Sequence, residues 1–205
     1  LRTLNAHEGA VRDLDWDAQG RRLASAGNDS TARVWDAASG QQVAALTGHE
    51  GNVLSVEWSP DGSQLVTSSE DGSARIWDAV DGSLLTTLSG HTDYVFQAHW
   101  KSDGSQLLTA GRDNQAWVWD AATGEPVLKL IGHSEPVFNA EWSPDETRIL
   151  TGSRDSLAKV WDAAIGKELL TLAGHVGSVN NIDWSPDGQL IATAGADGLG
   201  RIWHT

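Results

Sequence analysis

Residues 48–78 read GHEGNVLSVEWSPDGSQLVTSSEDGSARIWD, and the rest of the chain repeats this stretch at a constant spacing. Two tryptophan series mark a period of 42 residues without a slip. One series is Trp16, Trp58, Trp100, Trp142 and Trp184, and the other is Trp35, Trp77, Trp119, Trp161 and Trp203. A repeat of this length is one supersecondary unit that cannot bury its apolar faces alone, so neighbouring repeats must stack.

Within the quoted stretch, apolar residues alternate with polar ones, which indicates short β-strands. Apolar runs begin at Val53, Leu65 and Ala74, and a fourth follows at Leu85, just beyond the quoted stretch. Turn sequences such as SPDG at 59–62 separate them. In these turns Pro presets one backbone dihedral and Gly supplies a positive φ. Four short antiparallel strands per unit, repeated radially, predict the blades of an all-β propeller rather than a sandwich.

Each repeat begins near a Gly-His pair and closes on a Trp-Asp pair. The Gly-His pairs are Gly48-His49, Gly90-His91, Gly132-His133 and Gly174-His175, and the Trp-Asp pairs are Trp35-Asp36, Trp77-Asp78, Trp119-Asp120 and Trp161-Asp162. Two copies depart, with Ala6-His7 at the start and Trp203-His204 at the end. In these in-phase pairs, over essentially its whole length, the chain resembles the WD40 family of β-propellers. The resemblance implies a scaffolding or sensing role.

We expect a single β-propeller domain over residues 1–205, because the composition does not change along the chain. Its repeats are 1–42, 43–84, 85–126, 127–168 and 169–205. The first residues align with the fourth strand of a blade, whereas the last repeat stops after a third strand. Three arrangements follow: a closed five-bladed ring in which strand 1–4 completes the last blade, an open arc that completes rings with other copies, or part of a larger propeller. The absence of Met and the unmatched ends favour a piece of a longer protein over a natural stand-alone monomer.

The charge balance limits the classes of partner. Asp and Glu number 28 against 14 Lys and Arg, which gives a net charge of −14. This argues against nucleic acid and anionic membranes, which need clustered basic residues, and favours a partner with a cationic patch. No apolar run approaches the roughly 20 residues of a membrane helix, and the first residues are not a signal peptide. We therefore expect a soluble, cytoplasmic chain.

Every repeat carries a hydroxyl residue, a His and an Asp in register with its closing Trp. The sets are His7, Ser25, Asp29 and Trp35; His49, Thr67, Asp71 and Trp77; His91, Thr109, Asp113 and Trp119; His133, Thr151, Asp155 and Trp161; and His175, Thr193, Asp197 and Trp203. One such set has the composition of a hydrolase triad. A hydrolase needs one exposed nucleophile, whereas this set occurs five times and exchanges Ser for Thr.

We interpret these tetrads as structural hydrogen-bond networks, and the WD40 resemblance implies the same role. We expect no enzymatic activity and no cofactor. We also expect no metal site, because the acidic turns are much shorter than a twelve-residue calcium loop.

Recognition should then depend on the positions at which the repeats differ. Three variable columns fall at the end of the blades that carries the histidines: Ala10, Asn52, Tyr94, Pro136 and Ser178; Arg12, Leu54, Phe96, Phe138 and Asn180; and Asn28, Glu70, Arg112, Arg154 and Ala196. They hold the only Tyr and both Phe of the chain. Aromatic residues and Arg are enriched at interface hot spots. We predict partner binding by Tyr94, Phe96, Arg112, Phe138, Arg154, Arg12, Leu54 and Glu70. The alternatives are packing between blades for the rings and solvated charge for the arginines.

The third repeat departs from the others at two further positions. His99 stands where the other repeats have Asp or Glu, and Trp117 replaces a basic residue. Because Trp117 lies two residues before Trp119 on a strand, both side chains point to the same face. We expect Trp117 to be an extra packing residue, with a lateral contact as the alternative.

The leading functional hypothesis is a non-enzymatic scaffold or sensor platform that presents its histidine-bearing end to a protein or peptide. One alternative is a purely structural or engineered propeller fragment that self-associates to complete a ring. Another is lectin-like binding of a small ligand, which predicts equivalent aromatic pockets between blades. The clustering of the aromatic residues in two repeats disfavours this last hypothesis.

Overall fold

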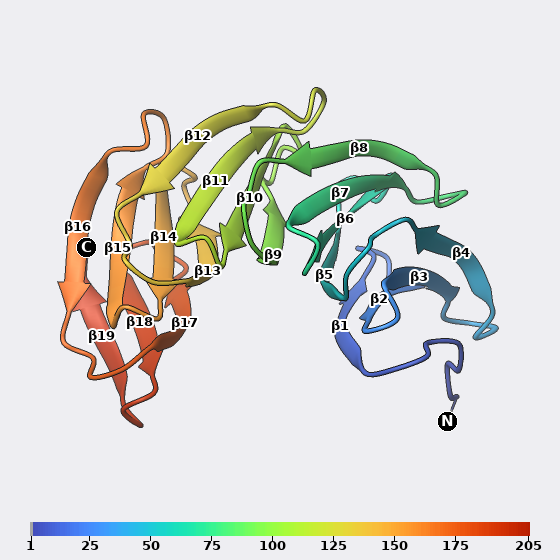
Figure 1. The fold of residues 1–205 in the computed structure, drawn as a ribbon, viewed down its shortest axis with the longest axis horizontal. Coiled ribbons are helices and arrows are strands. Elements are labelled where there is room, and N and C mark those ends of the chain that lie inside the picture. The colour runs from blue at the N-terminus through green and yellow to red at the C-terminus, as the bar shows by residue number, and fades with distance from the viewer. Residues whose placement is uncertain (1) are drawn as a thin grey trace.

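The computed structural model describes residues 2–205 as nineteen β-strands in five antiparallel sheets, with no helix. It therefore offers no helix in these residues that could cross a membrane. The blades, numbered one to five, are β1–β4 (Val11–Trp16, Arg22–Gly27, Thr31–Asp36, Gln42–Thr47), β5–β8 (Val53–Trp58, Gln64–Ser69, Ser73–Asp78, Leu84–Ser89), β9–β12 (Val95–Trp100, Gln106–Gly111, Gln115–Asp120, Pro126–Ile131), β13–β16 (Val137–Trp142, Arg148–Ser153, Leu157–Asp162, Glu168–Ala173) and β17–β19 (Val179–Trp184, Leu190–Gly195, Gly200–His204). Figure 1 shows them side by side along an arc.

The first strand of every blade carries a β-bulge at the same position. In blade one, Val11 pairs with Gly27 and Asp13 with Ala26, so that Arg12 has no partner across the ladder. The unpaired residues in the other blades are Leu54, Phe96, Phe138 and Asn180. A bulge bends its strand and changes the direction in which a side chain points. One of the three variable columns therefore consists of bulge residues.

The hydrophobic core lies between blades. Each buried cluster joins residues of two neighbours, as where Ala24 and Val34 of blade one pack with Trp58 and Trp77 of blade two. Burying a Trp removes about 150–250 Å² from water, which stabilises the fold by roughly 4–6 kcal/mol as an upper bound. Tryptophans of both series take part in each of the four interblade clusters.

The two ends of the described chain do not meet. Blade five has three strands, and residues 2–7 form no strand. Arg2 Nη1 instead donates a hydrogen bond to the Ala37 carbonyl oxygen of its own blade, at 2.8 Å. The predicted pairing of residues 2–4 with β19 is therefore absent, and Leu1 lies outside the described residues. At the spacing set by their Trp-filled interfaces, the five blades span only part of a circle (Figure 1). The described residues form an open arc and not a closed five-bladed ring (Figure 1).

Candidate functional site

Each blade brings its His, hydroxyl, Asp and Trp side chains into one hydrogen-bonded chain. In blade two, His49 Nδ1 lies 2.8 Å from Asp71 Oδ2, and His49 Nε2 lies 2.7 Å from Thr67 Oγ1. Trp77 Nε1 donates to the same Thr67 oxygen at 2.8 Å. The corresponding distances in the other four blades lie between 2.8 and 3.0 Å. A neutral His that donates from Nδ1 and accepts at Nε2 satisfies every group in this chain.

The burial and electrostatics of the tetrads agree with the structural role that the sequence predicts. The Thr67, Thr109 and Thr151 residues are fully buried, at 0% exposure. Although burial raises the pKa of Asp71, the hydrogen bonds from His49 and Ser73 outweigh it and hold that pKa well below its ordinary value. Burial lowers the pKa of His133, which favours the neutral form of its imidazole. A hydroxyl that is buried and already bonded on two sides offers no open path to a substrate.

The variable columns converge at the end of each blade that carries the tetrad His. The Arg112 backbone N–H donates to the Tyr94 carbonyl oxygen at 2.8 Å, and Arg154 N–H donates to Pro136 in the same way at 2.9 Å. These bonds place the column before the tetrad Asp directly against the column that precedes the first strand. The bulge residue of the first strand is the third member of the group. We call the surface formed by the three columns the His-loop face.

On blades three and four this face carries an aromatic and arginine cluster. The Arg112 guanidinium carbon lies 5.0 Å from the centre of the Tyr94 ring, within cation–π range. The Phe96 and Phe138 rings meet edge to face, with centroids 5.6 Å apart. Both Phe rings are partly buried, and the Arg112 side chain is 49% exposed. The Phe pair thus joins two blades while part of each ring still contacts solvent.

The other predicted binding residues lie on blades one and two and bond to their own neighbours. Arg12 Nε donates to Asn28 Oδ1 at 2.7 Å, and Glu70 Oε2 accepts from Asn52 Nδ2 at 2.9 Å. Leu54 is partly buried at its bulge. The His-loop face is therefore polar on blades one and two and aromatic on blades three and four.

Family comparison assigns the repeats. The model of the WD domain, G-beta repeat, matches residues 1–36, 40–78, 82–120, 124–162 and 166–204. The chain belongs to the WD40 family. This confirms the relationship that the Gly-His and Trp-Asp pairs predict. WD40 repeats are generally protein-interaction scaffolds and are typically non-enzymatic. No curated protein matches the chain.

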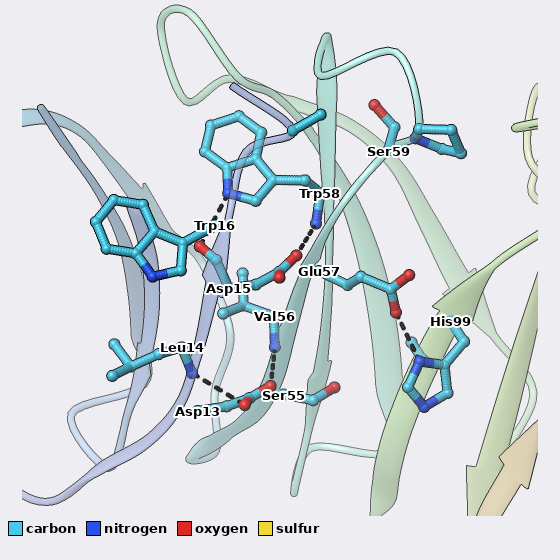
Figure 2. Close-up of a pocket in the computed structure, with 13 residues that line it drawn as sticks. Asp13, Leu14, Asp15, Trp16, Ser55, Val56, Glu57, Trp58, Ser59 and His99 are labelled. Atoms are coloured by element: carbon cyan, nitrogen blue, oxygen red, sulfur yellow. Dashed lines mark hydrogen bonds and ion pairs between the residues drawn. The ribbon is translucent and has the colours of Figure 1, made fainter. Parts of the chain in front are cut away.

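Sequence reasoning missed a set of acidic side chains on the first strands of these WD40 blades. Asp13 Oδ2 accepts a hydrogen bond from Val56 N–H at 3.0 Å, and Asp15 Oδ2 accepts one from Trp58 N–H at 2.8 Å. Figure 2 shows both bonds crossing from blade one to blade two, in a pocket of about 450 Å³. The acids cap N–H groups on the unpaired edge of β5, which would otherwise be open to another strand.

The same row of first-strand residues continues into blades three to five, where its electrostatics change. His99 Nδ1 lies 2.6 Å from Glu57 Oε2, and although burial lowers the pKa of His99, this bond raises it overall. Burial and the nearby Asp183 carboxylate raise the pKa of Glu141 to about 7. Asp or Glu recurs in this column at the 42-residue period, which is the signal that could have identified it. Within residues 2–205, no three His, Asp or Glu side chains gather as metal ligands would.

Trp117 has a packing role in the third WD40 blade. Its ring stacks on Trp119 with centroids 5.0 Å apart, and it is buried. Lys129 Nζ lies 3.8 Å from the centre of its ring on the other side. In blades one and five the equivalent Arg33 and Arg201 instead form ion pairs with the tetrad Asp. The structure therefore favours the packing interpretation over a lateral contact.

Proposed function

We propose that this WD40 chain is a non-enzymatic interaction scaffold or sensor platform that presents its His-loop face to a protein or peptide. The observation that carries the proposal is the coincidence of three features on one surface. Three variable columns of the repeats lie there, the only Tyr and both Phe of the chain belong to these columns, and in every blade one residue of the columns is the unpaired residue of a bulge. The general role of WD40 repeats agrees with it.

The bulge in each first strand supports a division between residues that hold the blades together and residues that contact a partner. Because the extra residue has no residue directly opposite it on the next strand, its side chain can change without disturbing a cross-strand side-chain pair. The same position holds Arg12, Leu54, Phe96, Phe138 and Asn180 in the five blades. A repeated backbone with one variable, unpaired position per blade is suited to presenting a different set of contacts from each blade.

The chemistry of the cluster indicates the kind of segment that it would bind. Phe96 and Phe138 offer a partly exposed apolar surface, and Arg112 and Arg154 on the same two blades are exposed. Arg binds carboxylates with a planar, two-pronged geometry. We propose a peptide that places an apolar side chain against the Phe pair and a carboxylate against an arginine. The acidic surface elsewhere would favour cationic residues farther along the same partner.

Selection of binding peptides from a displayed random library tests this function. The selected peptide should lose affinity about tenfold or more for Arg112→Ala and for Phe96→Ala, as expected of hot-spot residues. Arg21→Ala is the matched control, because Arg21 is exposed on the turn between β1 and β2, away from the His loops. Equal affinity for all three folded variants would place recognition elsewhere and refute the proposal.

Self-association is a second candidate, favoured by a single observation. Trp16 is 54% exposed on blade one, whereas the equivalent Trp58 is 5% exposed between blades one and two. An open arc therefore leaves a surface that is buried wherever two blades meet.

A further inference from the structure

At two interfaces of the arc, an arginine of one blade lies against the first-strand Trp of the next blade. The Arg22 guanidinium carbon lies 4.3 Å from the centre of the Trp58 ring, between blades one and two. The Arg148 guanidinium carbon lies 4.7 Å from the centre of the Trp184 ring, between blades four and five. Arg22 and Arg148 are repeat equivalents, and both distances lie within cation–π range.

The same two arginines also bond the turn between the first and second strands of the next blade. Arg22 Nη2 donates to the Gly62 carbonyl oxygen at 2.9 Å. Arg148 Nη2 donates to the Gly188 carbonyl oxygen at 2.9 Å. A Trp ring and a turn carbonyl therefore hold a guanidinium group at two places within this chain.

Between blades three and four, a lysine takes the place of the arginine. Gln106 is the repeat equivalent of Arg22 at this interface. Lys101, from the turn of blade three, instead places its Nζ 5.9 Å from the centre of the Trp142 ring. A basic side chain therefore lies against the first-strand Trp at three of the four interfaces of the described blades.

The interface between blades two and three lacks this cation. Gln64 stands at the position of Arg22, and Ser59 stands at the position of Lys101. Within residues 2–205, no Lys or Arg lies over the ring of Trp100, the first-strand Trp of blade three. The interface thus has the tryptophan without the basic group that accompanies it elsewhere.

The turns at this interface keep the separation that they have where a guanidinium is bound. Gly104 is the repeat equivalent of Gly188, and their φ angles are 71° and 66°. A methyl group on Gly104 would lie 4.0 Å from Pro60 Cδ, and one on Gly188 would lie 3.7 Å from Pro144 Cδ. The methyl group on Gly188 would also lie 3.6 Å from Arg148 Nη2. The interface between blades two and three has therefore not collapsed onto the place of the missing arginine.

A pocket of about 440 Å³ lies at this place. Trp100 and Gly104 of blade three line one side, and Asp61 and Gln64 of blade two line the other. Asp103 also lines the pocket, from the turn that contains Gly104. The ring and the carbonyl-bearing turn that hold a guanidinium at other interfaces are thus both in contact with open space here.

The two carboxylates make this pocket attractive to a cation. Hydrogen bonds from the serine residues of their own turns lower the pKa of Asp61 and of Asp103, so both are ionised at neutral pH. Lys101 Nζ lies 3.7 Å from Asp103 Oδ2 and balances part of this charge. Within residues 2–205, Asp61 forms no ion pair, so its charge is available to a ligand.

We propose that the pocket between blades two and three binds a guanidinium group from outside the chain. The group donates to the Gly104 carbonyl oxygen, as Arg22 donates to that of Gly62, and it lies beside Trp100. The Asp61 carboxylate pairs with its charge. The ligand is an arginine side chain of a partner or a small molecule that carries the same group.

This site is separate from the His-loop face. The turns that line it, 59–62 and 101–104, follow the first strands of blades two and three. They lie at the end of the blades opposite the His loops, which precede those strands. Substitutions in the pocket should therefore leave peptide binding at the His-loop face unchanged, and failure of one proposal does not affect the other.

Titration of the 205-residue chain with blocked Gly-Gly-Arg-Gly-Gly and Gly-Gly-Lys-Gly-Gly peptides tests the inference. Binding is followed by the NMR signal of the Trp100 indole N–H, which Trp100→Phe assigns. The arginine peptide should shift this signal to saturation and bind at least several-fold more tightly than the lysine peptide, because a planar guanidinium is more weakly hydrated and stacks better on a ring. No shift with the arginine peptide, or equal affinity for the two peptides, would overturn the proposal.

Gln64→Arg supplies the missing guanidinium from within the chain. It should weaken binding of the arginine peptide by about tenfold or more and raise the melting temperature by about 2–4 °C. Gln106→Arg is the matched control, because it makes the same substitution one interface along and should bind the peptide like the parent chain. Circular dichroism confirms that both variants are folded. Undiminished affinity in folded Gln64→Arg would overturn the proposal.

Agmatine, a free alkylguanidine, distinguishes the two sources of the ligand. Saturable binding of either agmatine or the arginine peptide at Trp100 supports a guanidinium site. Tighter binding of the peptide assigns the site to an arginine of a partner, and tighter binding of agmatine assigns it to a small molecule. Failure of both probes to shift the Trp100 signal would refute the site.

Discussion

Thr67→Val removes the hydroxyl at the centre of one tetrad and leaves its volume nearly unchanged. Trp77 Nε1 then loses its acceptor and His49 Nε2 loses its partner, and both side chains are buried. An unsatisfied buried polar group costs about 1–3 kcal/mol. The free energy of unfolding should therefore fall by about 2–6 kcal/mol.

Thr67→Ser is the matched control, because blade one already uses Ser25 at the equivalent position. It keeps both hydrogen bonds and removes one buried methyl group, for a loss of about 1 kcal/mol. At about 2–4 °C per kcal/mol for a chain of this size, Thr67→Val should melt at least several degrees below Thr67→Ser. Thermal unfolding followed by tryptophan fluorescence makes the comparison. Equal melting temperatures for the two variants would refute the claim that the tetrad holds the blade together.

Three further predictions concern other parts of the arc. Trp58→Ala should lower the free energy of unfolding by about 3–5 kcal/mol, and Trp16→Ala by roughly 1 kcal/mol or less in dilute monomer, because only Trp58 is buried between blades. Urea unfolding of the two variants makes the comparison. Equal losses of stability would contradict this account of the packing. Because the pKa of Glu141 is raised to about 7, the folded state binds a proton that the unfolded state has lost, and the free energy of unfolding should fall as the pH rises from about 4.5 to 7. Glu141→Gln should be about 1–3 kcal/mol more stable than the parent chain at pH 8 and close to it at pH 4. An equal difference in stability at both pH values would disprove this linkage. Because the pKa of Asp71 is lowered in the folded state, the ionised carboxylate stabilises the fold above pH 3.8, and this stabilisation is lost as the pH falls below 3.8. Asp71→Asn should be less stable than the parent chain at pH 7 and approach the parent's stability in acid. A stability difference that widens in acid would exclude this linkage.

The sequence predicts the blades well because their determinants are local and repeated. Alternation of apolar residues, the Gly-containing turns and the 42-residue tryptophan spacing predict the four-stranded sheets without knowledge of distant contacts. The hydrogen-bonded order of His, hydroxyl and Trp also follows, because antiparallel strands bring the His loop and the Asp turn to the same end. The five tetrads illustrate how repetition within one chain indicates which residues serve the fold.

Features that depend on relations between blades could not be predicted in this way. The bulges at Phe96 and Phe138 require the pairing register, which a period of two does not reveal. The open arc depends on the angle between stacked sheets, which side-chain packing determines over the whole chain. Asp13 and Asp15 read as ordinary polar strand residues, and only the neighbouring blade shows that they cap the edge of β5.

The central claim is that regular positions hold the blades together and irregular positions recognise the partner. Titration calorimetry of a selected peptide against Thr109→Val and Arg112→Ala tests it within one blade, at a temperature at which both variants are folded. The account predicts that Thr109→Val keeps the affinity of the parent chain despite a lower melting temperature, and that Arg112→Ala loses affinity without a change in melting temperature. Loss of affinity in Thr109→Val with full affinity in Arg112→Ala would contradict it.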